Sequence, residues 1–267
     1  MLIQYNNTIS MKRFLIIAYS IIGYSFGILS ILAYALYLMD SALWKFNFYQ
    51  VEFNLDSTQS VLFNIGLMFI FSIQHSGMAR RRFKKVLSKY FPAAVERSTY
   101  IVSSSIMLWM LILCWQELPF ILFDIGANYF GSIQIIYWLG WGLVVLSTFQ
   151  IDHFHFFGIK QALKYSFKDK VYTQEFKIPF FYKIVRHPLY LGLIILHWST
   201  SEMTVSRFLL ALCITLYIYI GTWFEEKDLE FDFGNKYKTY KKMVPKLFPI
   251  KPINAIRQIT NQIPKTK

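Results

Sequence analysis

The stretch Phe14–Met39, FLIIAYSIIGYSFGILSILAYALYLM, decides the fold class of this chain. It contains no Asp, Glu, Lys or Arg, and it exceeds the roughly 20 residues with which an α-helix crosses about 30 Å of hydrocarbon. Three more stretches, 57–79, 98–116 and 125–151, are also free of charge. None of them alternates strictly between apolar and polar residues, as the strands of a membrane barrel do. The sequence therefore predicts an all-α, polytopic integral membrane protein.

The composition agrees with this class. Hydrophobic residues make up 55% of the 267 positions and charged residues only 16%, whereas soluble domains carry about 25% charge. We expect five to six transmembrane helices in a single membrane domain of residues 1–267. The expected segments are spans at about 14–39, 57–78, 98–116 and 133–151, a helical hairpin at 188–224, and a cytoplasmic tail at 225–267.

The positive charge follows an alternating pattern along the chain. Of the 28 Lys and Arg residues, 26 lie at 12–13, at 80–97, at 160–186 or after Glu226, so that every second loop is basic. Basic loops stay in the cytoplasm, and both termini are therefore expected there. Anionic membrane lipids are the expected partners of this charge. The net charge of +13 gives no reason to invoke nucleic acid.

A polar cluster interrupts this pattern near the last hairpin. Arg186–Gly192 reads RHPLYLG, and Glu225–Leu229, EEKDL, follows an apolar stretch. A hairpin brings both segments to one membrane face. Polar groups beside lipid favour function. The alternatives are a solvated helix end with salt bridges for the acids and a membrane anchor for Arg186. Gly192 would allow close approach either of a ligand or of a neighbouring helix.

The histidines are the other candidate reactive groups. His153 and His155 are two residues apart and would point away from each other on a helix, so the sequence predicts no metal site. His75 indicates a polar pocket near the cytoplasmic face, where it serves either function or a hydrogen bond between helices. The chain lacks a G-x-G-x-x-G or P-loop motif. A Rossmann-type methyltransferase is therefore not indicated.

The combination of motifs resembles the membrane methyltransferases of the isoprenylcysteine carboxyl methyltransferase type. The matching segments are Arg186–Gly192, Glu225–Leu229, Phe233–Tyr240 and Val244–Pro249. The resemblance implies that the C-terminal helices and tail form a cytoplasm-facing pocket for S-adenosyl-L-methionine. It implies a set of cofactor-binding residues: His187, Pro188, Tyr190, Gly192, Glu225 and Glu226. Arg186 is expected at the cofactor or near the acceptor.

Segments further upstream narrow this resemblance to one branch. Gln74–Arg80, Val95–Tyr100 and His155–Gln161 look like those of the bacterial methanethiol S-methyltransferases, although Lys160 stands where an Arg is expected. The branch implies methyl transfer from S-adenosyl-L-methionine to methanethiol or a similar small thiol, with dimethyl sulfide as product, in the bacterial inner membrane. Thiol transfer needs a thiolate, and His75 and His155 are the candidate bases.

Other readings stay open on the same residues. Isoprenylcysteine carboxyl methylation and phospholipid methylation use similar C-terminal motifs. The segment around His75 also looks like the NnrU-like membrane proteins, which include a haem-dependent branch without methyltransferase activity. Glu225, Glu226 and the Arg186-His187-Pro188 sequence favour a methyltransferase over that alternative.

Overall fold

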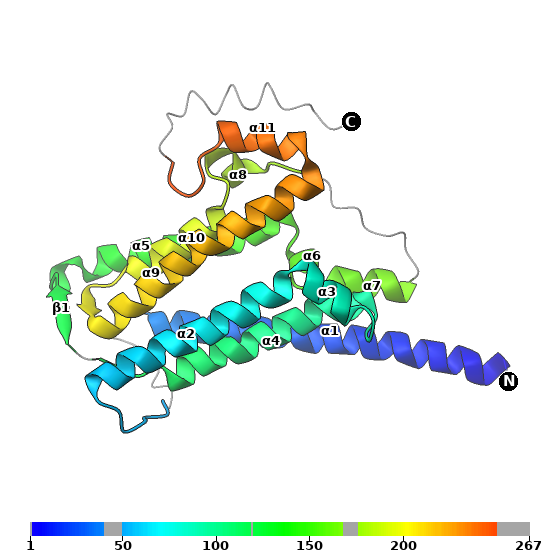
Figure 1. The fold of residues 1–267 in the computed structure, drawn as a ribbon, viewed down its shortest axis with the longest axis horizontal. Helices are drawn as coiled ribbons and strands as arrows, with labels where there is room; N and C mark the ends of the chain where they lie inside the picture. The colour runs from blue at the N-terminus through cyan, green and yellow to red at the C-terminus, as the bar shows by residue number, and fades with distance from the viewer. Residues whose placement is uncertain (1, 40–49, 119, 168–175, 250–267) are drawn as a thin grey trace. The chain divides into compact units, whose positions relative to one another are not determined.

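The computed structural model describes residues 2–39, 50–118, 120–167 and 176–249 (Figure 1). Five of the helices in these residues are long and apolar enough to cross a membrane. They are α1 (Leu2–Leu38, apolar from Met11), α2 (Ser57–Ala79), α4 (Ala93–Cys114), α5 (Phe130–Ile151) and α10 (Val205–Phe233). The prediction of an all-α, multi-pass integral membrane protein is confirmed.

The chain divides into two compact units. The first unit contains residues 1–119 and 152–173, and the second contains residues 120–151 and 174–267. In the first unit, α4 packs against both α1 and α2. Three short helices complete it: α3 (Arg81–Leu87), α6 (His153–Phe156) and α7 (Ile159–Phe167).

The second unit is built around α9 (Pro188–Trp198), which packs against α5 and α10. With 11 residues, α9 is roughly 16 Å long at 1.5 Å per residue and is too short to cross a bilayer. The strands β1 (Ile121–Asp124) and β2 (Glu202–Thr204) pair antiparallel, with Asp124 opposite Glu202. The remaining elements are the 3-10 turn η1 (Ala127–Tyr129), α8 (Phe180–Ile184) and α11 (Asn235–Met243).

Two helix starts show how local sequence sets the boundaries. α2 begins behind Asp56, whose side chain accepts from the Gln59 backbone N–H at 2.9 Å, while the Gln59 side chain accepts from the Asp56 N–H at 3.1 Å. This reciprocal pair satisfies two N–H groups that the first helical turn leaves unbonded. α4 begins at Ala93 behind Pro92, earlier than the expected residue 98. The expected start lay just after the charged residues Glu96 and Arg97. An acidic residue such as Glu96 is, however, favourable in the first turn of a helix.

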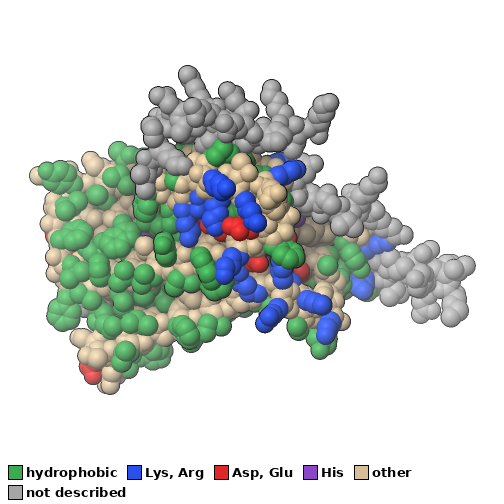
Figure 2. Space-filling model, turned by 45° about the horizontal axis from the view of Figure 1, so that its top comes forward, with side chains coloured by type: hydrophobic (Ala, Val, Ile, Leu, Met, Phe, Trp, Pro, Cys, Tyr) green, Lys and Arg blue, Asp and Glu red, His purple; other side chains and the backbone are tan. Residues whose placement is uncertain are grey.

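The end of α10 positions the last part of the chain. Gly234 has a φ of +57° and closes the helix, because glycine adopts this backbone conformation readily. In α11, Tyr237 and Tyr240 are buried together with Val244, and Phe176 and Phe233 pack against them. The aromatic cluster holds α11 against the C-terminal end of α10, while Lys236 and Lys238, on either side of Tyr237, are exposed. Figure 2 shows Lys and Arg side chains gathered around a few acidic ones, beside a surface that is mainly hydrophobic.

Candidate active site

Backbone hydrogen bonds join the start of α9 to the tail of the second unit. The Arg186 N–H donates to the Pro245 carbonyl at 2.9 Å, and the His187 N–H donates to the Lys246 carbonyl at 3.1 Å. Pro188 then occupies the first helical turn, where its missing N–H costs nothing. The motif residues and the tail therefore form one local structure, although more than 50 residues separate them.

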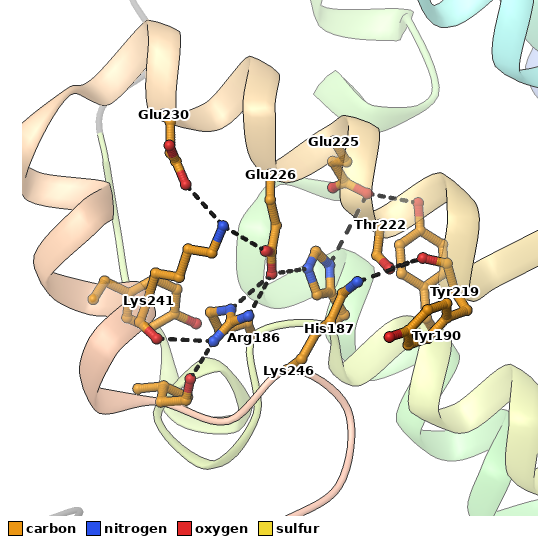
Figure 3. A network of polar contacts seen from close by, with 12 residues as sticks. Arg186, His187, Tyr190, Tyr219, Thr222, Glu225, Glu226, Glu230, Lys241 and Lys246 are labelled. Carbon is orange, nitrogen blue, oxygen red and sulfur yellow. Dashed lines mark hydrogen bonds and ion pairs between the residues drawn. The ribbon is translucent and has the colours of Figure 1, made fainter.

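Glu226 is the centre of a buried polar network (Figure 3). Its Oε1 accepts from Arg186 Nε at 2.8 Å and Nη2 at 2.7 Å, and lies 3.1 Å from His187 Nε2. Its Oε2 lies 3.1 Å from Lys241 Nζ. The side chains of Glu226 and Arg186 are only 5% and 9% exposed. Charged groups this well buried are stable when they are paired and hydrogen-bonded.

The other side of the Arg186 guanidinium fixes the tail. Nη1 donates to the carbonyls of Lys241 at 2.9 Å and Val244 at 2.6 Å. These carbonyls stand at the C-terminal end of α11, where helical acceptors lack intrahelical partners. All three nitrogen atoms of the guanidinium thus form hydrogen bonds within the protein. Arg186 is therefore a structural cation that connects α9, α10 and α11. Its position does not fit the alternative of a membrane anchor, whose charged end would reach into water.

Glu225 has a different environment from Glu226. Its side chain is 42% exposed, and its Oε2 accepts from the Tyr190 hydroxyl at 2.8 Å. His187 Nδ1 lies 4.0 Å from the same oxygen, too far for a hydrogen bond. The Tyr190 ring stacks on the His187 imidazole, with centroids 5.6 Å apart and planes at 30°. The two adjacent acids have separate partners, and Glu225 is the one that a ligand can reach.

Gly192 faces a neighbouring helix. A Cβ atom added to Gly192 would lie 2.7 Å from the Gly140 carbonyl oxygen of α5, and one added to Gly140 would lie 3.0 Å from the Gly192 oxygen. Small residues allow helix backbones to approach in membranes. Of the two alternatives for Gly192, close helix packing is therefore the one with direct geometric support, and its contact with a ligand stays a prediction.

Two lysines of the second unit belong to this region and were not predicted. Lys241 bridges Glu226 and Glu230, and its hydrogen bond to Glu230 at 2.8 Å is the main reason that its pKa is raised. Lys246 Nζ lies 4.7 Å from the Tyr219 ring centroid, and burial lowers its pKa. Both lysines lie among surface-type lysines in the sequence. In the sequence, Lys241 follows Tyr237 by four residues, which is about one helical turn. This spacing is the one sign in the sequence that Lys241 lies on a helix that packs near Glu226.

A buried hydroxyl marks the same aromatic cluster. Tyr237 is 2% exposed, and its Oη finds no hydrogen-bond partner among the described residues. Burial, and then the charge of Glu226, raise its pKa, so the hydroxyl stays protonated as a donor. The Tyr240 hydroxyl, in contrast, donates to the Tyr182 carbonyl at 2.6 Å. An unpaired buried donor is costly, and a bound polar ligand would remove that cost.

The two candidate bases belong to the first unit. His75 in α2 lies 2.7 Å from the Tyr100 hydroxyl through Nε2 and 3.1 Å from the Ser104 hydroxyl through Nδ1. The Phe71 ring stacks on its imidazole at 5.3 Å. His155 lies in α6, and burial lowers its pKa against the opposing effect of Asp152. A neutral imidazole has one ring nitrogen that carries no proton and can take one up, so both residues keep the chemical capacity of a base.

Lys160 occupies the position where the resemblance called for arginine. Its Nζ lies 2.7 Å from Asp152 Oδ2, while Asp152 Oδ1 accepts from the His155 N–H at 3.1 Å. A lysine satisfies this single contact as well as an arginine would. The departure therefore affects an ion pair that starts α6, and it leaves the His155 side chain in place.

Metal ligands do not gather in the described residues: no three His, Cys, Asp or Glu side chains there could hold one ion. The residues that the sequence singled out form two groups. Arg186, His187, Pro188, Tyr190, Gly192, Glu225 and Glu226 come together in the second unit, whereas His75 and His155 lie in the first.

Comparisons with known proteins give a consistent result. The chain is 41% identical over 191 residues to the methanethiol S-methyltransferase of Pseudomonas deceptionensis, which covers 71% of this chain and 73% of the relative. It is 37% identical over 194 residues to the methanethiol S-methyltransferase of Mycobacterium tuberculosis, covering 72% and 79%. A nurim homolog of Drosophila melanogaster is 26% identical over 226 residues, covering 76% and 89%. No family model and no solved structure matches.

Proposed function

Since the chain belongs to the methanethiol S-methyltransferase family, we propose that it methylates methanethiol with S-adenosyl-L-methionine and releases dimethyl sulfide. One observation of the structure carries the cofactor part of the proposal. A reachable carboxylate, Glu225, stands beside a fully paired one, Glu226, at a site built by the family motifs. Such a site offers an acceptor to a ligand without disturbing the ion pairs that hold it together.

The residues present fit the polar groups of S-adenosyl-L-methionine. The Glu225 carboxylate can accept hydrogen bonds from an ammonium group or a ribose diol. The partnerless Tyr237 hydroxyl supplies a donor for a carboxylate or a ring nitrogen. Tyr190 and His187 present stacked rings beside Glu225. Arg186 and Glu226, which we call the frame, hold this arrangement in place through their ion pair.

The chemistry is a direct methyl transfer. When bound, the cofactor would supply a methyl group on a sulfonium: the thiolate sulfur would bond to this carbon, the bond to the sulfonium sulfur would break, and S-adenosylhomocysteine would be the leaving group. The contribution of the protein is to orient the two reactants in line. Exclusion of water from the reacting atoms would favour this step, because opposite charges are neutralised in it.

The acceptor must first lose its proton. Small thiols are mostly protonated at neutral pH, as free cysteine is with a pKa of about 8.5. His75 and His155 remain our candidates for accepting this proton. Arg186 is assigned to the cofactor frame, because Glu226 neutralises its charge and two carbonyls take its remaining donors.

The decisive experiment measures dimethyl sulfide. Membranes that contain the protein are mixed with S-adenosyl-L-methionine and methanethiol, and the headspace is analysed by gas chromatography. We expect product from the wild type, a loss of at least tenfold in Glu225→Ala, and activity within twofold of wild type in Glu230→Ala. Glu230 is the matched control, since it lies on the same helix and its ion pair with Lys241 is half-exposed. Absence of product from the wild type would overturn the proposal.

We also propose that the protein lies in a bacterial inner membrane with both termini in the cytoplasm, in contact with anionic lipids. The alternation of basic loops supports this orientation. Fusions of green fluorescent protein and alkaline phosphatase at each terminus test it. Fluorescence with an inactive phosphatase is the expected result, and an active phosphatase at either terminus would contradict the orientation.

A further inference from the structure

The first unit contains an arginine whose charge is not balanced by an acid. Arg97 in α4 has no carboxylate partner among the described residues. The two nearby acids are occupied: Glu96 lies 3.2 Å from Lys84 Nζ, and Asp152 lies 2.7 Å from Lys160 Nζ. Partly buried cations are normally paired, so an unpaired one points to an anion that arrives from outside the chain.

Two aromatic rings lie against the Arg97 guanidinium. Its Cζ lies 4.9 Å from the Tyr100 ring centroid and 4.8 Å from the Phe156 ring centroid. Nε donates to the Phe156 carbonyl. Within the described residues, Nη1 and Nη2 donate to no acceptor, so the terminal donors of a fixed, planar group are available.

Gly158, just after α6, allows the contact between Phe156 and α4. Gly158 has a φ of +95°, and a Cβ atom there would lie 2.8 Å from the Ser98 hydroxyl oxygen and 3.0 Å from the Ser98 nitrogen. Only glycine combines this backbone conformation with such close packing on α4. The family motifs around Arg97 and Phe156 therefore meet because Gly158 brings α6 onto α4.

The surroundings of Arg97 are polar and positive. Tyr100 carries the hydrogen bond to His75, and the charge of Arg97 is one cause of the lowered pKa of His155, together with Lys160 and Lys164. Asp152 is the only carboxylate among the causes of that shift, and Lys160 already pairs with it. A small anion bound here would be stabilised by this surplus of positive charge.

We propose that Arg97 binds the acceptor as its thiolate, with sulfur at the terminal guanidinium nitrogens and the apolar substituent against Tyr100 and Phe156. This inference rests on the proposed function and adds the acceptor contact to it. The S–H bond breaks on binding and the proton goes to a candidate base or to water. The sulfur lone pair then forms the new S–C bond while the bond from the methyl carbon to the sulfonium sulfur breaks. Because the cation stabilises the anion, ionisation is favoured even when no imidazole accepts the proton.

A lipid phosphate is the other anion that a cation near a membrane surface can bind. Two basic side chains of α3, Arg82 and Lys85, are exposed and can meet phosphates. Arg97, in contrast, turns towards Phe156 through its Nε hydrogen bond. We therefore favour the thiolate, and the kinetic test separates the two anions.

The test compares Arg97→Met, Arg97→Lys and the matched control Lys84→Met in the full-length protein. Lys84 is a cation of the same unit that Glu96 already neutralises. Methanethiol is varied at saturating S-adenosyl-L-methionine, and binding of the cofactor is measured by calorimetry. We expect a KM for methanethiol at least tenfold higher in Arg97→Met, a smaller increase in Arg97→Lys, no change in Lys84→Met, and unchanged cofactor affinity in all three.

A second measurement uses the unmodified protein and so does not depend on the folding of a variant. Thiocyanate, a small sulfur anion, should inhibit competitively against methanethiol at millimolar concentration, whereas neutral acetonitrile should not. An active wild type with an unchanged KM in Arg97→Met, or without competitive inhibition by thiocyanate, overturns the inference and leaves the proposed function standing. A wild type that makes no dimethyl sulfide removes both.

Discussion

Two arginines, one in each unit, meet their surroundings in opposite ways. Arg186 in the second unit is 9% exposed and is neutralised by Glu226, while its other donors reach backbone carbonyls. Arg97 in the first unit lies against two aromatic rings and has no carboxylate partner among the described residues. An arginine paired with a carboxylate stabilises the fold. An arginine that lies against aromatic rings keeps a net positive charge that can attract an anionic ligand. The difference separates a frame from a proposed binding contact.

The largest effect is expected from breaking the frame. Glu226→Gln leaves Arg186 and Lys241 without their shared carboxylate. Removing one partner of a buried ion pair costs about 3–5 kcal/mol. We expect a lowered unfolding temperature, faster tryptic cleavage in the lysine-rich tail, and loss of cofactor binding. Glu230→Gln, which affects only a half-exposed ion pair with Lys241, should change little, and equal behaviour of the two variants would contradict the assignment of Glu226 as the centre.

A second, smaller effect concerns the packing of α9 against α5. Gly192→Ala places a methyl group 2.7 Å from the Gly140 oxygen, and overpacking of this kind costs about 1–3 kcal/mol. Thermal unfolding in one detergent should show a lower midpoint. Gly142→Ala is the control, because nothing lies within 4 Å of its added Cβ. A Gly192→Ala protein as stable as the control would return Gly192 to a role in ligand contact.

A third effect tests the reachable acid. Tyr190→Phe removes the hydroxyl that donates to Glu225 and keeps the ring that stacks on His187. A hydrogen bond to a protein acceptor contributes about 0.5–1.5 kcal/mol, which corresponds to roughly three- to tenfold in affinity. The Kd for S-adenosyl-L-methionine, measured by calorimetry, should rise by this factor. Tyr129→Phe, in the exposed turn η1, should leave it unchanged.

The smallest effect is expected in the first unit, at Asp152. Burial alone would raise the pKa of Asp152, but hydrogen bonds from Lys160 and from the His155 N–H lower it. A carboxyl group with a lowered pKa stabilises the folded state above its ordinary pKa, and this contribution is lost as the pH falls through the lowered value. Wild type and Asp152→Asn should differ by about 1 kcal/mol or less near neutral pH and converge on acidification. A difference that grows in acid would contradict this sign.

The sequence was sufficient for the fold class and for the motif residues of the second-unit network. Charge-free stretches identified four of the five long helices, and the predicted hairpin, which supplied the fifth, brought Arg186 and Glu226 to one end. The sequence could not show which of the two acids, Glu225 or Glu226, is buried in ion pairs and which is exposed. Adjacent residues on a helix point about 100° apart, and the neighbour of each depends on where α9 and α11 pack.

Other features of the site depend on contacts distant in the sequence. Lys241 and Lys246 look like surface lysines until the tail returns to the start of α9. In the sequence, Arg97 is one of several basic residues in 80–97, and only the fold shows that the adjacent Glu96 pairs with Lys84. Gly192 was left open between ligand and helix because its closest neighbour, Gly140, lies on another helix.

The backbone bonds from Arg186 and His187 to Pro245 and Lys246 have a consequence for biosynthesis. Translation proceeds from the N-terminus, so α9 and α10 are made before the segment that supplies these two carbonyls. The nascent membrane protein therefore carries every acid and histidine of the network while the network is still open. Competence to hold a ligand arrives late, with the last part of the described chain, and a ribosome stalled before Pro245 would leave an inserted but inactive protein.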